Sequence, residues 1–305
     1  MKRARIVFAI STVFCATICV AAESMPAAPP IQTEDVERFF RIYEATEGRP
    51  TAEVLQRDYL DAGSEGLHQL AKLRNVTGVR IADMIAKNPA MYDKARECMK
   101  VLPRVRERLT VALGSLVRLY PQARTPPVTI VVGRGKPVGV AGPATGIQIG
   151  LEALCATEWL NPNVEDRFVF VIAHEYIHVQ QSAELAEKAK PTVLELSLLE
   201  GAAEFAAELI AGRVAYSQVM ASTAGREKEI ETAFVAEMDS TDLSNWLYNG
   251  TVEKPGDLGY WVGYRIARSY YQHATDKQQA FREILEMGDA KALLGKSGWR
   301  PGMKL

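Results

Sequence analysis

The sequence predicts a mainly helical α+β protein, and three observations support this prediction. Apolar residues recur at helical spacing in several blocks between Glu34 and about Tyr120. The stretch 128–150 is instead rich in β-branched residues and glycine, as expected of short strands joined by tight turns. Helical patterns return after Asn163 and continue to about Leu294. We therefore expect a small sheet between two helical regions.

The N-terminus has the features of a secretory signal peptide. Basic residues at positions 2, 3 and 5 precede an apolar stretch, 6–20, and small residues lead to a cleavage site after Ala22. The apolar stretch is too short for a comfortable transmembrane helix. We expect residues 1–22 to be removed, which leaves an exported protein with no membrane anchor and a flexible Pro/Ala-rich leader over 23–33. Because so few cysteines remain, the periplasm is the expected destination.

The charge balance argues against nucleic-acid binding. The chain has 36 Lys and Arg residues against 37 Asp and Glu residues. Signal cleavage would lower the basic count from 36 to 33, so the mature protein would carry a formal charge of about −4. Of the four cysteines only Cys98 and Cys155 would remain. An oxidising compartment would permit a bond between them, and two buried free thiols are the alternative.

A helical N-terminal lobe is predicted over 34–120. Its last helix, about 93–119, is the longest, and the prolines that follow it end the lobe. The second region, 121–305, begins with strands over 128–150, which the glycine-rich connections predict to be antiparallel. The rest of this region is predicted to be helical, and its helices over about 164–212 carry the residues suited to chemistry.

The segment 168–179 is almost wholly apolar but contains His174, Glu175 and His178 in the spacing H-E-x-x-H. On a helix, positions i and i+4 lie on one face, so the two imidazoles can bind one ion. A helix that is apolar on all sides is normally buried, and a buried ionisable group is costly unless it is paired or binds a metal. We therefore predict that both histidines bind Zn²⁺ and that Glu175, beside the metal, handles protons.

The next apolar helix supplies a candidate for the third ligand that a catalytic zinc site requires. Glu200, Glu204 and Glu208 recur there at i, i+4 and i+8. Because leucines and alanines flank Glu200, we predict that it is buried and bound to a cation, whereas Glu208 fits a solvated position. Glu204 can accept the outer N–H of a ligating histidine. Gly201 lowers helix stability, which suggests that another element approaches it closely, the metal-binding helix being one candidate.

These motifs resemble the gluzincin metallopeptidases, in which H-E-x-x-H is followed by a glutamate ligand on the next helix. In this chain 21 residues separate His178 from the E-G-x-A-E segment 200–204. That form is similar to the M1-like branch and to a group of exported bacterial predicted zinc-dependent proteases. The resemblance implies a zincin-like catalytic region over 121–305. It implies the zinc ligands His174, His178 and Glu200, the general base Glu175, and Glu204 as the partner of a ligand.

The resemblance also implies a downstream tyrosine that stabilises the oxyanion. Tyr260 and Tyr264 are the candidates, with aromatic packing as the alternative for both. The strand 146–150, just before the metal helix, lies where such folds place an edge strand that pairs with extended peptide. The sequence lacks the G-x-M-x-N signature of the M1 aminopeptidases, which argues against aminopeptidase activity.

The sequence therefore predicts an exported zinc metallopeptidase that acts on peptide or protein substrates, as an endopeptidase rather than an aminopeptidase. In this prediction Glu175 takes a proton from a zinc-activated water. One rival is an exported peptide-binding or envelope-assembly protein with a non-catalytic zinc site, and another is a hydrolase of a different amide. The sequence contains no signal for substrate specificity or oligomeric state.

Overall fold

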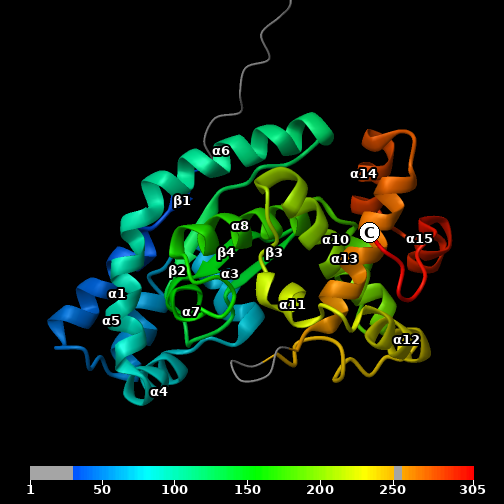
Figure 1. Cartoon of the computed structure of the whole chain (residues 1–305). Coiled ribbons are helices and arrows are strands. Elements are labelled where there is room, and N and C mark those ends of the chain that lie inside the picture. Colours follow the sequence, from blue (N-terminus) through cyan, green and yellow to red (C-terminus); the bar gives the residue numbers. More distant parts are fainter. Residues whose placement is uncertain (1–29, 251–255) are drawn as a thin grey trace, which may run out of the picture.

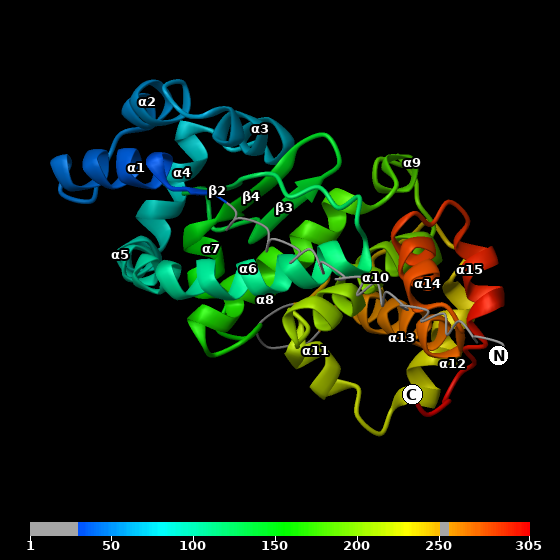
Figure 2. The ribbon, with the colours of Figure 1, turned by 90° about the horizontal axis from the view of Figure 1, so that it is seen from above.

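The computed structural model describes residues 30–250 and 256–305. The predicted fold class, α+β and mainly α, is confirmed: a small four-stranded sheet lies among many helices. In Figures 1 and 2, helices α1, α2, α4 and α5 lie at one end of the molecule, the sheet lies in the middle with α3 and α6 to α8 around it, and α10 to α15 lie at the other end.

The helices form three groups that follow one another along the chain. The first group along the chain contains α1 (Glu34–Ala45), α2 (Ala52–Val54), the π-helical turn η1 (Leu55–Leu60), α3 (Glu65–Arg74), α4 (Gly78–Lys87) and α5 (Pro89–Cys98). The middle contains the 3-10 turn η2 (Met99–Val101), α6 (Leu102–Leu119), α7 (Leu151–Ala156) and α8 (Val164–Gln180). The remaining helices are α9 (Ala183–Ala186), α10 (Val193–Ala211), α11 (Ser217–Ser222), α12 (Glu227–Glu237), α13 (Leu258–His273), α14 (Lys277–Leu285) and α15 (Ala290–Ser297).

The sheet is mixed, which corrects the prediction of an antiparallel sheet. Its strand order is β1-β2-β4-β3. Both β1 (Ile31–Gln32) and β4 (Gly146–Gly150) run parallel to β2 (Val128–Val131), and β3 (Gly139–Gly142) is antiparallel to β4. The chain leaving β2 passes beyond the place of β4 before it turns back, so the hairpin puts β4 inside the sheet. The edges are therefore β1 and β3, and the prediction that 146–150 forms an edge is wrong. We call β3, the edge that packs on α8, the edge strand.

The described chain begins just before β1. This strand lies inside the range predicted as a flexible leader (23–33), so regular structure starts before the predicted end of the leader. The predicted signal peptide, 1–22, lies outside the described residues. Within 30–250 and 256–305, no helix combines the length and the hydropathy needed to cross a bilayer.

The single helix predicted over 93–119 is in fact two helices, α5 and α6, separated by a 3-10 turn. Pro103 accounts for the break, because proline lacks an N–H and fits only the first turn of a helix, which it occupies in α6. A disulfide joins Cys98, at the end of α5, to Cys155 of α7. Of the two alternatives for these cysteines, the structure has the bonded one.

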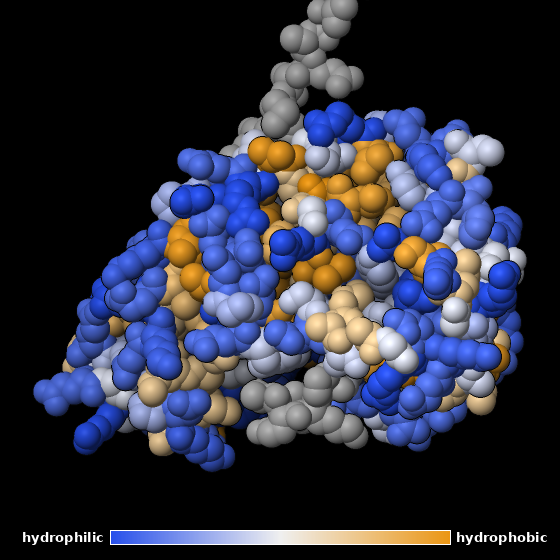
Figure 3. Space-filling view, viewed as in Figure 1, coloured by the Kyte–Doolittle hydropathy of each residue, from blue (hydrophilic) through white to orange (hydrophobic). Residues whose placement is uncertain are grey.

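Helix α8 runs through the middle of the molecule. Strands β3 and β4 pack on it, as do helices α6 and α10. The segment Arg167–Ile177 is buried without interruption, as its apolar sequence predicts. On the face drawn in Figure 3, hydrophilic residues cover both flanks and hydrophobic ones gather in the middle, below α6. The predicted metal-binding helix is thus a core element.

Helices α10 and α13 cross at very close range because both have glycine at the crossing. A Cβ on Gly201 would lie 2.5 Å from the Cα of Gly263, and a Cβ on Gly263 would lie 2.5 Å from the carbonyl carbon of Ser197. The element that approaches Gly201 is therefore α13, and not the metal-binding helix. This close crossing brings Tyr260 of α13 to a cavity that α8 and α10 also line.

Candidate metal centre

Helix α8 positions both histidines. Its N-cap is Asn163, whose side chain accepts a hydrogen bond from the Asp166 N–H at 3.0 Å. Further along, His174 and His178 lie one turn apart with their Nε2 atoms 3.0 Å from each other. His174 is only 5 % exposed. Two buried imidazoles at this distance require a shared cation or proton between them.

Helix α10 supplies the third donor. It begins with a capping box and ends at Gly212 in the left-handed conformation, so its limits are set locally. Glu200 Oε2 lies 3.3 Å from Nε2 of His174 and 3.2 Å from Nε2 of His178. The donor atoms of the three side chains all lie within 4.8 Å of one another. The structure therefore brings together the three residues that the sequence singled out.

Each histidine has a partner for its other ring nitrogen. Nδ1 of His174 lies 2.7 Å from Glu204 Oε1, an ion-pair contact that is not aligned as a hydrogen bond. Nδ1 of His178 lies 2.6 Å from Gln181 Oε1, and Gln181 Nε2 donates to the Leu199 carbonyl at 2.6 Å. Gln181 Oε1 can only accept, so Nδ1 of His178 carries the hydrogen and its Nε2 faces the cluster with a lone pair.

The cluster favours a positive charge at its centre. Burial on its own would lower the pKa of His174, but its contacts with Glu200 and Glu204 raise it well above the usual value. Burial would likewise raise the pKa of Glu200, but His178 and His174 hold it far below its usual range. A carboxylate that stays ionised beside two imidazoles is well suited to a bound cation.

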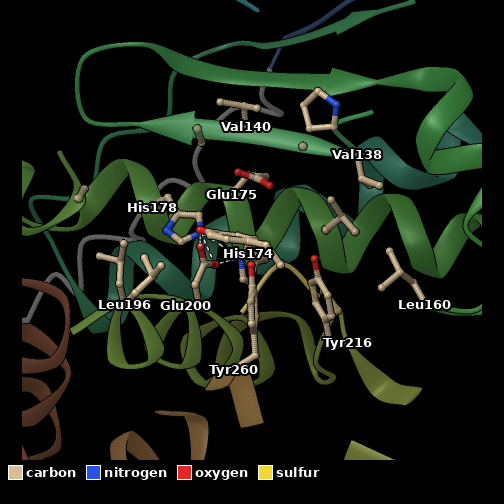
Figure 4. Close-up of a pocket in the computed structure, with 18 of the residues that line it drawn as sticks. Val138, Val140, Leu160, His174, Glu175, His178, Leu196, Glu200, Tyr216 and Tyr260 are labelled. Carbon is tan, nitrogen blue, oxygen red and sulfur yellow. Dashed lines mark hydrogen bonds and ion pairs between the residues drawn. The ribbon is translucent and has the colours of Figure 1, made fainter. Parts of the chain in front are cut away.

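Glu175 lies beside the cluster and beneath the edge strand (Figure 4). Gly139 of β3 packs on it so closely that a Cβ at position 139 would lie 2.8 Å from Glu175 Cδ. Burial raises the pKa of Glu175, and the charges of His178 and His174 oppose that rise. A carboxylate with a raised pKa is suited to accept a proton and to return it.

A cavity of about 350 Å³ lies over the cluster. Figure 4 shows it running along α8, with Val138 and Leu160 towards one end, Leu196 towards the other, and the cluster between them. Val140, on the edge strand, lines the opposite wall. Apolar walls around a few convergent polar groups are typical of a ligand-binding site.

Three tyrosines line this cavity. The rings of Tyr216 and Tyr260 are stacked with their centroids 4.7 Å apart, and Figure 4 shows both hydroxyls pointing into the cavity. Tyr248 lies on the rim and donates its hydroxyl hydrogen to Glu200 Oε1 at 2.9 Å. Tyr264 lies elsewhere, because its hydroxyl donates to Glu208 Oε2 and accepts from Arg268, both at 2.7 Å. Of the two tyrosines named from the sequence, the structure brings Tyr260 to the cavity.

Sequence reasoning missed four residues of this site: Gln181, Tyr216, Tyr248 and Arg74. All four lie at helix ends or in loops, where helical spacing gives no information about direction. The backbone of Tyr216 is held by α10, since the Tyr216 N–H donates to Glu204 Oε2 at 3.1 Å. The carboxylate that contacts His174 therefore also holds the loop that carries Tyr216.

The donor set fits zinc. Catalytic zinc sites in proteins use three ligands drawn from His nitrogen, Glu oxygen and Cys sulfur, and keep one position for water. Two imidazoles and one carboxylate converge at the wall of a cavity of about 350 Å³, which leaves room for a water beside them. The buried Nδ1 of His174 faces a carboxylate, as is usual for a histidine that binds zinc through its other nitrogen.

Comparison with known families agrees with this geometry. Residues 156–291 match the family model described as "Predicted Zn-dependent protease (DUF2268)". The match spans α8, α10 and α13, and therefore all three donor residues and Tyr260, but it excludes the sheet and the helices before it. No curated protein and no solved structure matches the chain. The prediction of zinc as the cofactor is confirmed by the family match and the buried cluster together.

Proposed function

We propose that the protein is a zinc metallopeptidase that hydrolyses peptide bonds in the cavity over His174, His178 and Glu200. The observation that supports this proposal most strongly is the position of Glu175. A zinc site that served only to stabilise the fold would be closed and would need no carboxylate beside it. In this protein a buried carboxylate lies next to the donor cluster, at the wall of an open cavity.

The edge strand suits an extended peptide. Strand β3 pairs with β4 along one of its edges, and its other edge has no partner strand in the described sheet. Residues 137–141, which include most of β3, line the cavity. An extended chain can add to such an edge through its backbone N–H and C=O groups, which recognises a peptide whatever its side chains. In this pose the peptide lies between β3 and the donor cluster, with its carbonyl carbons above Glu175. The substrate class is therefore a peptide or protein in extended conformation.

The chemistry then divides among a few groups. A zinc ion held by the three donors would lower the pKa of water and polarise the scissile carbonyl. Glu175 takes the proton from the attacking water and delivers it to the amine nitrogen as the C–N bond breaks, which yields a carboxylic acid and an amine. Tyr260 donates its hydroxyl hydrogen to the carbonyl oxygen as negative charge develops there. Glu204 and Gln181 hold the two imidazoles in orientation.

Two finer features belong to the same proposal. The order of the donors, with Glu200 on α10, after H-E-x-x-H on α8 and the short α9, and with Glu204 one turn on, supports a gluzincin type of site. The lack of the G-x-M-x-N signature supports cleavage within a chain rather than removal of N-terminal residues. We also propose that the protein acts outside the cytoplasm, in the periplasm, on the strength of its N-terminal sequence.

Metal removal and reloading test this proposal. The protein is treated with a chelator, its turnover of a mixed peptide library is measured by mass spectrometry, and zinc is then restored. We expect turnover to be lost on chelation and to return with one zinc per chain. The variant Glu200→Ala should bind zinc far more weakly and show no turnover. Peptides that are retained but never cleaved by the zinc-loaded wild type would instead support a peptide-binding protein.

A further inference from the structure

One cation lines the cavity from outside the two donor helices. Arg74 is the last residue of α3, which packs against β2 and β4, and it lines the cavity. Among the described lining residues it is the only lysine or arginine. Its helix lies outside the part of the chain that matches the protease family. The site already assigned makes no use of this charge.

The backbone at Arg74 is fixed, and no side chain of the described residues engages its guanidinium. The helix ends at Asn75 in the left-handed conformation, with φ of 50°. Arg134, in the connection between β2 and β3, donates from Nη2 to the Arg74 carbonyl at 2.9 Å. Among residues 30–250 and 256–305 the fold therefore leaves this cation unpaired, at a defined point of the cavity wall.

Arg74 lines the same cavity as Glu175 beside the donor cluster and Tyr248 on the rim. A ligand that reaches from the donor cluster to the rim would pass within range of this guanidinium.

The charge balance favours an anionic ligand. A zinc ion held by the three donors would balance the charges of Glu175 and Glu200, which are the two acidic residues of the described lining. Arg74 adds one positive charge that nothing else in the described lining compensates. A planar guanidinium presents parallel N–H groups that match the two oxygens of a carboxylate. In a peptide, carboxylates occur at the C-terminus and on Asp and Glu side chains.

We propose that Arg74 binds a carboxylate of the substrate and so selects peptides that present one near the bond to be cleaved. This inference rests on the proposed function. The carboxylate has two possible sources, and they differ in consequence: a C-terminal carboxylate directs cleavage to the end of a chain, and a side-chain carboxylate directs it to acidic sequences. In both cases Arg74 is a specificity residue that the helical lobe contributes to the site.

Equilibrium binding tests the proposal without requiring turnover. The zinc-loaded Glu175→Gln protein is titrated by calorimetry with short alanine/leucine peptides in matched pairs. One pair differs in a free or amidated C-terminus, and the other, with both C-termini amidated, differs in an internal Glu or Gln. In one of the two pairs, the peptide that carries the carboxylate should bind about 10- to 100-fold more tightly than its neutral counterpart, which is the gain expected from hydrogen bonds between charged groups. The pair that shows this preference identifies the source of the carboxylate.

Two further variants assign the preference to Arg74. Adding Arg74→Gln should remove the preference and leave the affinity for the neutral peptides unchanged. Lys72→Gln is the matched control, because it removes one positive charge from the same helix at a residue that does not line the cavity. This variant should keep the preference for the carboxylate peptide. Equal preference in the Arg74→Gln and parent proteins would overturn the proposal, as would a preference in neither pair or no binding of any peptide. Carboxylate-dependent binding with no cleavage by the wild type would sink only the proposed function.

Discussion

Gly139 of the edge strand lies directly against the carboxyl group of Glu175. A Cβ at position 139 would come within 2.8 Å of Cδ and 3.0 Å of Cγ of that side chain. The strand that is suited to hold the substrate backbone is thus in contact with the group that is suited to move the proton. The distance between them is set by the absence of a side chain at a single position.

Adding a methyl group at Gly139 should therefore impair turnover without removing the metal. In Gly139→Ala the carboxyl of Glu175 must shift by roughly 1 Å, and misplacement of that size can lower kcat by about 100-fold. Zinc content should stay at one per chain, because the three atoms nearest to the added Cβ all belong to Glu175, which is not one of the donors. The matched control is Gly142→Ala at the other end of β3, where the nearest atom would be Thr145 Oγ1 at 3.3 Å. Equal activity of the two variants would contradict this role of the contact.

Substitutions of Glu204 and Glu208 test whether the contact between Glu204 and His174 strengthens zinc binding. Both belong to the acidic stripe of α10, but Glu204 contacts His174 and Glu208 contacts the Tyr264 hydroxyl. We expect Glu204→Gln to weaken zinc binding by about 10- to 100-fold, since removing the partner of a ligating histidine typically costs that much. Glu208→Gln should bind zinc like the wild type. Competition with a chromophoric chelator measures both, and a similar loss in the two variants would refute the assignment.

Substitutions of Tyr260 and Tyr264 should have different effects on kcat, because only Tyr260 of these two lines the cavity. Tyr260→Phe should lower kcat by about 100-fold or more with little change in KM, because the loss of one hydrogen-bond donor to an oxyanion costs about that much. Tyr264→Phe should stay within about twofold of the wild type, since its hydroxyl is engaged by Glu208 and Arg268 outside the cavity. Steady-state kinetics on one peptide decide the point. Unchanged kcat in Tyr260→Phe would exclude Tyr260 as the oxyanion donor.

The helix crossing predicts opposite effects for two helical glycines. A Cβ on Gly201 would meet the backbone of α13, whereas nothing lies within 4 Å of a Cβ on Gly295 in α15. We expect Gly201→Ala to lower the free energy of unfolding by about 1–3 kcal/mol or more. Gly295→Ala should raise it by up to about 1 kcal/mol, because alanine favours helix. Urea denaturation compares the two, and an undiminished stability of Gly201→Ala would show that the two helices do not cross this tightly.

The donor residues could be predicted because spacing along a helix fixes the direction in which the side chains project. His174, His178 and Glu200 occur in apolar helices, where a charged residue must find a partner within the core. Nothing comparable defines the sheet, since strand order depends on where the chain goes after β2. The prediction therefore assigned the edge to β4, whereas β3 occupies it. The break at Pro103 follows a local rule and could have been predicted.

The remaining parts of the site come from contacts between distant segments. Gly139 meets Glu175, and Arg134 holds the carbonyl of Arg74, across separations that no periodicity records. Gly201 correctly indicated that another element approaches α10 closely. It did not identify that element, because a glycine in a sequence does not show which helix packs against it. Such pairings require the folded structure.

The whole mechanism depends on proton transfer by Glu175 at a zinc site formed by His174, His178 and Glu200. A comparison of peptide turnover by the wild type and Glu175→Gln, at equal zinc content, measures this dependence. We predict one zinc per chain in both proteins and a loss of turnover of about 100- to 10,000-fold in the variant, the range for removal of a general base. Equal turnover by the two zinc-loaded proteins would contradict the proposed role of Glu175.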